Sequence, residues 1–393
     1  MKAVAVRPGH RIKVLFVESG RRGGSVFRLK SILERLDPGR FEAGLLSWYR
    51  DRAAARLYQV ESLFCRRTLG LRGEQPDTIK HLGGLQLPTP FGFYYYLVSR
   101  SLIARHQPHV AYFNTGIEGH EPAILAASRA GVPVVCHIRS SHKLNRDGRL
   151  AARRVGRFVT SSRWGMQQFA GELERPLGDF DCVYEAIDLR SFDLRARQEM
   201  PPPLPDGPLY VCLVGSLIAR KRPVLAIQGL AAARGRCPDL RLVLAGEGPL
   251  GGEVERQVKL AQLETAVIRL GNVSAVPALL RRCHVGLLAS ESEGMPNAVM
   301  EYMAAGLPVV TSSVPGVDEL VDHGSTGLIV RDPLTPQSIA DALCELANDT
   351  GQRASFGRAA RTKIERHEFR PEAEVAGVSN VLVKTAAGVE PGA

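Results

Sequence analysis

Two glutamates, Glu293 and Glu301, stand on either side of a predicted helix start, where a pair of carboxylates could take part in chemistry. Pro296 disfavours helical backbone before it and Asn297 is a good N-cap, so we expect a helix over Ala298–Ala305. Glu301 then lies in the first turn and Glu293 in the preceding loop. Helix N-terminal amides favour a phosphate, and carboxylates accept hydrogen bonds from hydroxyls. A nucleotide sugar, with a phosphate centre flanked by sugar hydroxyls, would satisfy both kinds of group.

The ends of three other predicted strands carry glycine loops. Gly215 opens a loop that holds Arg220–Arg222, where a cation could neutralise a phosphate. The turn Gly246–Pro249 lets backbone approach a ligand, and Gly316–Glu319 begins another helix. An acidic loop with a capping carboxylate would explain the glutamates taken alone. Four loops at successive strand ends favour a phosphate-binding rim instead.

The elements that must position these loops alternate between short β-branched runs and helical patterns, which is typical of parallel sheets with crossover helices. In the first half we expect strands at Ile12–Val17, Val110–Phe113, Val132–Ile138 and Phe158–Ser161. In the second half we expect them at Leu209–Val214, Leu240–Ala245, Val267–Leu270 and Val285–Leu288. Polar or glycine residues follow these strands, at the edge where open α/β sheets bind ligands.

A proline-rich segment, Pro201–Pro208, interrupts the alternation near the middle of the chain and has the composition of a linker. We therefore expect an α/β fold with two doubly wound, Rossmann-like domains, over residues 1–200 and 209–369. Such a pair would bind ligands in the cleft between its domains. Residues 370–393 are expected to form a helix and a frayed tail.

The composition narrows the class of protein. The chain has 393 residues, 45% of them hydrophobic, which excludes general disorder. Its formal charge of +11 is uneven: residues 1–200 carry 32 Lys and Arg against 19 Asp and Glu, and the remainder 19 against 21. Either an anionic partner or a solvated basic surface would account for the excess. Nucleic acid is excluded as a partner, because no motif of a nucleic-acid-binding module is present.

Cysteine usage and hydropathy indicate the compartment. The seven cysteines are an odd number without a C-x-x-C pair, which fits reduced thiols rather than a disulfide framework. No signal peptide and no apolar stretch of transmembrane length is found. We expect a cytoplasmic protein that is soluble or lies peripherally on the inner face of the membrane.

The stretch from Leu213 to Pro333 resembles the nucleotide-binding domain of retaining, family 4 glycosyltransferases (glycosyl transferases group 1), which have the GT-B fold. The motifs that carry the resemblance are G-x-L-x-x-x-K (Gly215–Lys221), A/V-G-x-G-P (Ala245–Pro249), G-N-V (Gly271–Val273), the spaced glutamates, A-x-G-x-P-V-V (Ala304–Val310), P-G-V-x-E-L-V (Pro315–Val321) and G-x-T-G-L-I-V (Gly324–Val330).

The resemblance implies a role for each matching residue. Glu301 would hydrogen-bond the donor ribose, Glu293 would contact the hexose hydroxyls, and Lys221 would be the cation on the diphosphate. The backbone of residues 294–297 would approach the sugar and phosphates. The full donor-binding set is Gly215, Ser216, Arg220, Lys221, Gly246, Gly248, Val273, Glu293, Gly294, Met295, Pro296, Asn297 and Glu301, and the catalytic set is Lys221, Glu293 and His137.

The first half resembles the family more loosely. Gly23 and Gly24, which follow the first strand, and His137 with Arg139 at a later strand end, look like the acceptor side. Residues 1–200 would then be the acceptor-binding domain, and residues 209–369, which follow the linker, would be the donor domain. The terminal helix would cross back to the first domain. A lone histidine at a strand end is otherwise a satisfied structural residue.

Two departures from the family pattern stand out. Glu185-Ala186 occupies the place where the family has Asn-Gly. Ser216 follows the glycine of the first donor loop, where many members have arginine. Arg220 or Arg222 could supply the missing charge; if neither does, donor affinity should be lower or activity lost.

The mechanism implied is hexosyl transfer with retention at the anomeric carbon, in which the leaving phosphate takes the acceptor proton. No D-x-D-like metal site is found, so the diphosphate would be stabilised by Lys221, neighbouring arginine and helix-terminal amides. We expect no cofactor and no metal; the nucleotide sugar is a substrate and the acceptor is a glycan or a lipid-linked, anionic molecule. A nucleotide-sugar epimerase, a glycogen or sucrose type synthase, and a degenerate scaffold that binds only nucleotide or membrane remain as alternatives.

An aromatic segment, Leu85–His106, combines Phe91, Phe93 and Tyr94–Leu97 with Arg100 and Arg105. Such a segment could lie on an anionic bilayer. The alternative is a core helix with a solvated basic edge, and both interpretations stay open.

Overall fold

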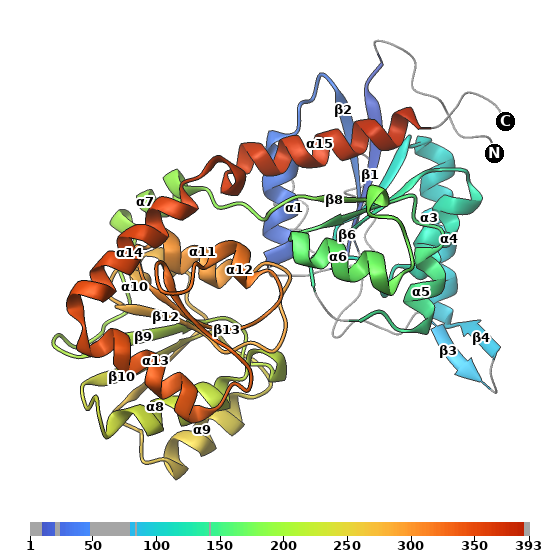
Figure 1. Cartoon of the computed structure of the whole chain (residues 1–393). Helices are drawn as coiled ribbons and strands as arrows, with labels where there is room; N and C mark the ends of the chain where they lie inside the picture. Colours follow the sequence, from blue (N-terminus) through green and yellow to red (C-terminus); the bar gives the residue numbers. More distant parts are fainter. Residues whose placement is uncertain (1–9, 20–23, 48–78, 83–84, 141–142, 389–393) are drawn as a thin grey trace. The chain divides into compact units, whose positions relative to one another are not determined.

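A computed structural model describes residues 10–19, 24–47, 79–82, 85–140 and 143–388 (Figure 1). The chain divides into two compact units, the first built from residues 1–185 and 371–393 and the second from residues 186–370. Each unit contains one parallel, six-stranded sheet with helices on both faces. The predicted α/β class, with two doubly wound Rossmann-like domains, is therefore confirmed.

The sheet of the first unit has the order β2-β1-β5-β6-β7-β8. Its strands are β1 (Ile12–Glu18), β2 (Phe41–Ser47), β5 (Val110–Phe113), β6 (Val134–Ile138), β7 (Arg157–Thr160) and β8 (Phe180–Cys182). Its helices are α1 (Gly24–Arg35), α3 (Pro90–His106), α4 (Glu121–Arg129), α5 (Arg146–Ala152), α6 (Arg163–Glu172) and α15 (Pro371–Ala387). A separate antiparallel pair consists of β3 (Ile79–Leu82) and β4 (Leu85–Pro88).

Alternate residues of β1 bury opposite faces of this sheet, because successive side chains of a strand point to opposite sides. Leu15 and Val17 pack in one cluster with residues of α3, α4, α5 and α6. Val14 and Phe16 pack in the other, with residues of α1 and α15. Strands buried on both faces explain why the sequence reads as near-continuous apolar runs.

The sheet of the second unit has the order β11-β10-β9-β12-β13-β14. Its strands are β9 (Leu209–Val214), β10 (Leu240–Ala245), β11 (Val267–Gly271), β12 (Val285–Leu288), β13 (Val309–Ser312) and β14 (Gly327–Val330). Its helices are α7 (Leu189–Gln198), α8 (Pro223–Arg234), α9 (Gly251–Leu260), α10 (Val276–Leu280), α11 (Asn297–Ala304), α12 (Val317–Leu320), α13 (Pro336–Asn348) and α14 (Thr350–Ile364).

The direction of strand succession reverses between β9 and β12, which lie next to each other. In open α/β sheets this switch point is where the loops after the two strands diverge and leave room for a ligand. The fold therefore selects two loops of the second unit, residues 215–222 after β9 and residues 289–296 after β12. Both carry residues of the predicted donor set.

Two local expectations differ from the structure. Helix α11 begins at Asn297, and Pro296 occupies the N-cap position without a side-chain cap. The expectation that Asn297 caps the helix is therefore wrong, and Glu301 is the fifth helical residue rather than a member of the first turn. The extended backbone of Pro296 ends the loop one residue earlier than the capping pattern predicts.

The domain boundary also falls elsewhere. Helix α7 packs on α10 and belongs to the second unit, which begins at Ala186. Residues 201–208 form no helix or strand and connect α7 to β9 within that unit, where Leu204 is buried. The expected boundaries at residues 200, 208 and 369 thus differ from this division in the unit to which residues 186–208 and Arg370 belong. Residues 371–393 belong to the first unit, where α15 packs against α1 (Figure 1).

The aromatic segment forms helix α3, which has one buried and one exposed face. Thr89 caps it by accepting a hydrogen bond from the amide of Gly92. Tyr95, Ser99, Leu102 and Ile103 are buried against the sheet, as the core-helix interpretation requires. Phe93, Tyr94 and Leu97 are among the exposed large hydrophobic residues, so burial in the core does not account for them. Among the described residues, no helix is both long and apolar enough to cross a bilayer.

Helix α11 is held close to the sheet by a glycine and a tyrosine. A Cβ atom on Gly286 of β12 would lie 2.2 Å from ring atoms of Tyr302 of α11. The Tyr302 hydroxyl accepts from the Val214 amide at 2.8 Å and donates to the Leu287 carbonyl at 3.3 Å. The position of α11, and with it Glu301, therefore depends on this contact.

Gly286→Ala should lower the free energy of unfolding by about 1–3 kcal/mol, because the added methyl group has no space beside the Tyr302 ring. The matched control is Gly252→Ala in helix α9, where a Cβ would meet no atom within 4 Å. That substitution should be neutral or stabilise by up to about 1 kcal/mol. Urea denaturation measures both, and equal stability of the two variants would contradict the packing argument.

Candidate functional site

The loops after β9 and β12 bond directly to each other in the second unit. The amide of Glu291 donates to the Arg220 carbonyl at 2.8 Å, and Arg220 Nη1 donates to the Ser292 carbonyl at 2.5 Å. The side chain of Arg220 is thus fixed at the junction of the two loops. These contacts join the two loops at the switch point.

Glu293 lies between two cations at this junction. Its Oε1 is 2.5 Å from Lys221 Nζ and its Oε2 is 2.8 Å from Arg220 Nη1. Its side chain is 10% exposed, against 15% for Lys221 and 42% for Arg220. Burial alone would raise the pKa of Glu293, but Lys221 and Arg220 outweigh it and hold the pKa below the usual value. The carboxylate is therefore ionised at neutral pH.

This ion cluster gathers three members of the predicted donor set, Arg220, Lys221 and Glu293. It leaves one net positive charge, and it places this charge on a short 3-10 helix, Ala219–Lys221, just before the start of α8. Arg222 lies further out, 3.8 Å from the exposed Glu291. Arg220 and Arg222 are the two arginines that could substitute for the arginine missing at Ser216. Of these, Arg220 is the one that shares the Glu293 carboxylate with Lys221.

Gly246 and Gly248 permit two loops to touch. A Cβ on Gly246 would lie 2.0 Å from the Gly215 carbonyl oxygen, and one on Gly248 would lie 2.5 Å from the Leu217 carbonyl oxygen. The Leu217 amide donates to the Glu247 carbonyl at 3.0 Å, which fastens the contact. The close approach that these glycines allow is therefore to the neighbouring loop of the chain.

A cavity of about 580 Å³ adjoins this glycine contact. Leu217, Gly246–Gly248, Arg269 and Gly271 line it. Gly271 has φ +64°, in the left-handed region that favours glycine, and Val273 follows two residues later, half-buried in the loop after β11. The cavity therefore extends the donor-side surface from the loop after β9 to the loops after β10 and β11.

The remaining donor residues lie on the approach to α11. Gly294, Met295 and Pro296 form the end of the loop, with Met295 and Pro296 buried, and Asn297 begins the helix. Glu301 is half-buried on the helix itself, and Ser216 is exposed in the first loop. The structure thus assembles these positions around one switch point, while the role of each residue stays a prediction.

In the first unit, the predicted acceptor residues lie in different environments. Gly23 lies outside the described residues, and Gly24 is the exposed first residue of α1. His137 in β6 is fully buried, with Nδ1 2.6 Å from the Tyr112 hydroxyl, and its Nε2 has no hydrogen-bond partner among the described residues. Burial, together with the charge of Arg139, lowers the pKa of His137 well below 6.5, so the ring is neutral at pH 7.

Arg139 belongs to a buried ion network at the carboxyl edge of the first sheet. Its Nη1 is 2.5 Å from Glu185 Oε1, and its Nε and Nη2 donate to Asn114. Arg28 of α1 contacts the second oxygen of Glu185 at 2.9 Å. Glu374 of α15 lies 3.8 Å from Arg139 and 4.0 Å from Arg28. Two guanidinium groups thus neutralise two carboxylates that are 4% and 1% exposed.

The network accounts for the departure at Glu185. Burial would raise the pKa of Glu185, but Arg139 and Arg28 hold it below the usual value, and Glu185 in turn raises the pKa of Arg139 against the effect of burial. Sequence reasoning noticed the exchange of Asn-Gly for Glu185-Ala186 but missed the partners Arg28, Asn114 and Glu374. The available signal was a polar residue directly after a buried strand. Asn114 follows β5 in this way, and Arg139 follows β6.

No group of three or more His, Cys, Asp or Glu side chains that could hold a metal ion is found within the described part of the chain. The six cysteines that the structure describes are free thiols. Whether the protein works without a metal stays a prediction.

Two doubly wound units, with a lysine and a glutamate brought together at the switch point of the second, define the GT-B class of fold. Residues 195–363, within the second unit, match the family model described as glycosyl transferases group 1. The resemblance drawn from the motifs is thereby confirmed.

Individual relatives and one solved structure agree with the match to this family model. The chain is 29% identical over 204 residues to N-acetyl-alpha-D-glucosaminyl L-malate synthase of Bacillus anthracis, covering 51% of this chain and 52% of that protein. It is 28% identical over 315 residues to the GDP-mannose-dependent alpha-(1-6)-phosphatidylinositol monomannoside mannosyltransferase of Mycolicibacterium smegmatis, covering 72% and 78%. HepE from Anabaena, crystallised in complex with UDP and glucose, superposes with a TM-score of 0.74 at 19% identity over 95% of this chain and 100% of that one. The chain thus spans about half the length of the first relative, and likeness to the third establishes the fold.

Glu293→Gln should destabilise the protein at neutral pH, because the amide cannot neutralise Lys221 and Arg220. The folded-state pKa of Glu293 is below the ordinary 4.5, so the stabilisation is fully present above 4.5 and is lost as pH falls through the lowered value. The stability difference between wild type and variant, from urea denaturation at a series of pH values, should therefore shrink below pH 4.5. In a Lys221→Met background the pH dependence should be smaller; an unchanged dependence would contradict the pairing.

Glu185→Ala should lower the free energy of unfolding by about 3–5 kcal/mol, because it leaves Arg28 and Arg139 without their buried counter-charge. Glu42→Ala is the control, since Glu42 is 44% exposed and forms only long contacts with Arg11 and Lys13. It should cost at most about 1 kcal/mol. Urea denaturation followed by circular dichroism compares the two, and similar small losses would rule out a structural role for the network.

Proposed function

We propose that the protein is a retaining glycosyltransferase that moves a hexose from a nucleoside-diphosphate sugar to a glycan or lipid-linked acceptor. The observation that carries the proposal is the convergence of Lys221, Arg220 and Glu293 at the switch point of the second unit. The match of residues 195–363 to the family model supports the reaction class, and this cluster locates the proposed donor site within those residues. The assignment of hexose and nucleotide rests on the resemblance alone.

The donor would bind across the loops of the second unit. Lys221, with Arg220 beside it, would neutralise the diphosphate, while the carboxylate of Glu293 would accept hydrogen bonds from hexose hydroxyls. Glu301 on α11 would bind the ribose. The present pairing of Glu293 with both cations means that a donor diphosphate would compete with Glu293 for Lys221, which has the smaller and more mobile cationic head of the two.

The proposed step needs no protein nucleophile. The bond between the anomeric carbon and the leaving phosphate oxygen breaks, the acceptor oxygen bonds to the same face of the sugar, and the acceptor proton passes to the leaving phosphate. Charge that develops on the diphosphate would be stabilised by Lys221 and Arg220, so we propose a reaction without metal or other cofactor. His137, neutral and buried, would act from the acceptor side if a substrate reaches its Nε2.

The acceptor side is proposed to lie in the first unit, on Gly24, His137 and Arg139. A relative whose name includes a phosphatidylinositol mannoside acceptor supports an anionic, lipid-linked acceptor here. The location that matches such an acceptor is the cytoplasm, with the protein bound peripherally to the inner face of the membrane.

A second candidate is a scaffold that binds a nucleotide without catalysis. It is favoured by one observation, the exposed Ser216 where many family members have arginine. The position of Arg220 beside Lys221 and Glu293 argues for the enzyme, because it returns a guanidinium to the same loop junction.

Lys221→Ala and Glu301→Ala should each reduce transfer by about 100-fold or more, because the first removes stabilisation of the leaving diphosphate and the second removes a donor contact. Lys259→Ala is the matched control, since Lys259 is exposed on α9 and pairs with the exposed Glu255. Candidate nucleotide sugars are first selected by thermal shift, and product is then measured by release of nucleoside diphosphate, with its anomeric configuration determined by NMR.

Retained turnover in Lys221→Ala and Glu301→Ala would refute the site. Inversion in the product would refute the retaining step alone. Release of an altered sugar nucleotide without acceptor would indicate the epimerase, and nucleotide binding without any turnover would indicate the scaffold.

A further inference from the structure

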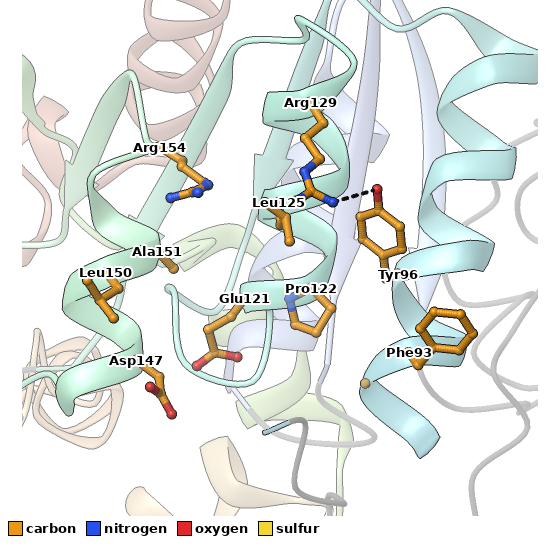
Figure 2. Close-up of a pocket in the computed structure, with 11 residues that line it drawn as sticks. Phe93, Tyr96, Glu121, Pro122, Leu125, Arg129, Asp147, Leu150, Ala151 and Arg154 are labelled. Atoms are coloured by element: carbon orange, nitrogen blue, oxygen red, sulfur yellow. Dashed lines mark hydrogen bonds between the residues drawn. The ribbon is translucent and has the colours of Figure 1, made fainter. Parts of the chain in front are cut away.

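A cavity of about 500 Å³ lies in the first unit between helices α3, α4 and α5 (Figure 2). None of its lining residues belongs to the donor or acceptor sets discussed above. The cavity therefore needs an explanation of its own.

The floor of this groove is apolar. Pro122 and Leu125 of α4 face Leu150 and Ala151 of α5, and Phe93 stands on the α3 side (Figure 2). Pro122 and Ala151 are buried, while Phe93 is 54% exposed. An apolar floor that ends in an exposed aromatic ring offers contact to an apolar group that enters from outside.

One end of the groove is cationic. Arg129, at the end of α4, donates to the Tyr96 hydroxyl at 3.3 Å and lies 5.8 Å from the centre of that ring. Arg154 lies across the groove from it (Figure 2). Both side chains are exposed, and neither has a carboxylate partner among the described residues. This end of the groove thus holds two positive charges that the described part of the fold does not neutralise.

The opposite end of the groove is acidic, and its carboxylates already have interaction partners within the chain. Glu121 begins α4, about 12 Å along the helix from Arg129, and Asp147 lies in the first turn of α5. Both have interaction partners within the chain. The groove could therefore bind a ligand with an anion at the arginine end and an apolar group along the floor.

The surface beside the groove extends the same chemistry. Tyr94 and Leu97 of α3 are 52% and 43% exposed, next to Phe93 on the same helix, and Arg100 is exposed one turn further on. On the other side, Arg153 is exposed at the end of α5. Aromatic rings beside arginines are the composition of a surface that sits at the boundary between lipid headgroups and acyl chains.

We propose that the groove between α3, α4 and α5 binds an anionic lipid of a bilayer, with the lipid phosphate on Arg129 and Arg154 and the adjoining acyl chain against Leu125 and Phe93. Tyr94 and Leu97 enter the same leaflet. The proposal deepens the proposed function, because it names the surface through which an enzyme with a lipid-linked acceptor reaches the membrane, and it rests on that function only for this purpose. Lipid binding itself needs neither donor nor turnover.

The test is co-flotation of the full-length protein with vesicles of phosphatidylcholine containing 30% phosphatidylglycerol, compared with vesicles of phosphatidylcholine alone. Wild type should bind the anionic vesicles at least tenfold more tightly. Arg129→Gln with Arg154→Gln should weaken this binding about 30-fold, because each basic residue at an anionic surface contributes about a fivefold gain. Phe93→Ser should weaken binding as well, by removing the aromatic contact.

Matched controls separate the groove from general electrostatics. Arg11→Gln with Arg40→Gln removes the same charge from the β1–β2 side of the first unit and should change binding less than twofold. Leu177→Ser replaces a residue of the same unit that is 52% exposed, close to the 54% of Phe93, and should have no effect. Circular dichroism confirms that each variant is folded.

Three results would overturn the proposal: equal binding to neutral vesicles, equal losses in the Arg129/Arg154 and Arg11/Arg40 pairs, or displacement of the vesicles by millimolar inorganic phosphate, which would indicate a site for a free anion. Nucleotide-sugar binding to the same preparations is measured by thermal shift. If the wild type does not bind the vesicles but still binds a nucleotide sugar, the lipid groove is rejected and the proposed function stands, whereas the reverse result would reject the function and leave the groove.

Discussion

Each unit buries a carboxylate between two cations at the carboxyl edge of its parallel sheet, and the surrounding elements hold these cations against it. Glu293 is held by Lys221 and Arg220, and Glu185 by Arg139 and Arg28. An isolated buried carboxylate would be costly, so each carboxylate depends on the cations beside it, and its removal would leave those cations without it. The constraint is the same in both units, but its consequence differs: in the second unit the cluster lies at the switch point, and in the first it ties the loop after β8 to α1 and α15.

The second unit shows how such a cluster can be both structural and chemical. Loop contacts bring Arg220 and Glu293 together, and the glycines at 246 and 248 let the loop after β10 press against the loop after β9. The backbone is therefore fixed by contacts that involve no substrate. Within the part of the chain that the structure describes, Lys221 is the member whose head group contacts one partner alone, Glu293. A site that is prearranged in this way loses little conformational freedom when an anion arrives.

The strand pattern of the fold could be predicted from sequence because buried parallel strands are continuous apolar runs. Four predicted strands, at Leu209–Val214, Leu240–Ala245, Val285–Leu288 and Val110–Phe113, coincide with β9, β10, β12 and β5. Prediction failed where a local signal competes with tertiary packing. Asn297 looks like a cap but follows a proline that already ends the loop, and the proline-rich segment looks like a linker although α7 before it packs on α10.

The site was predictable only in part, for a related reason. Motif spacing placed Lys221 and Glu293 at strand ends, and parallel strand ends share one edge of a sheet. Nothing local in the sequence indicates that Glu185 pairs with Arg28 and Arg139, which are 157 and 46 positions away, or that Glu374 joins them from the last helix. The same limit applies to net charge. The basic excess of the first half includes Arg28 and Arg139, which are neutralised inside the unit, so the excess available to a partner is carried by exposed residues such as Arg129 and Arg154. Charge becomes evidence for a partner only after the buried pairs have been removed from the count, and two of the exposed arginines that then remain, Arg129 and Arg154, line an apolar groove.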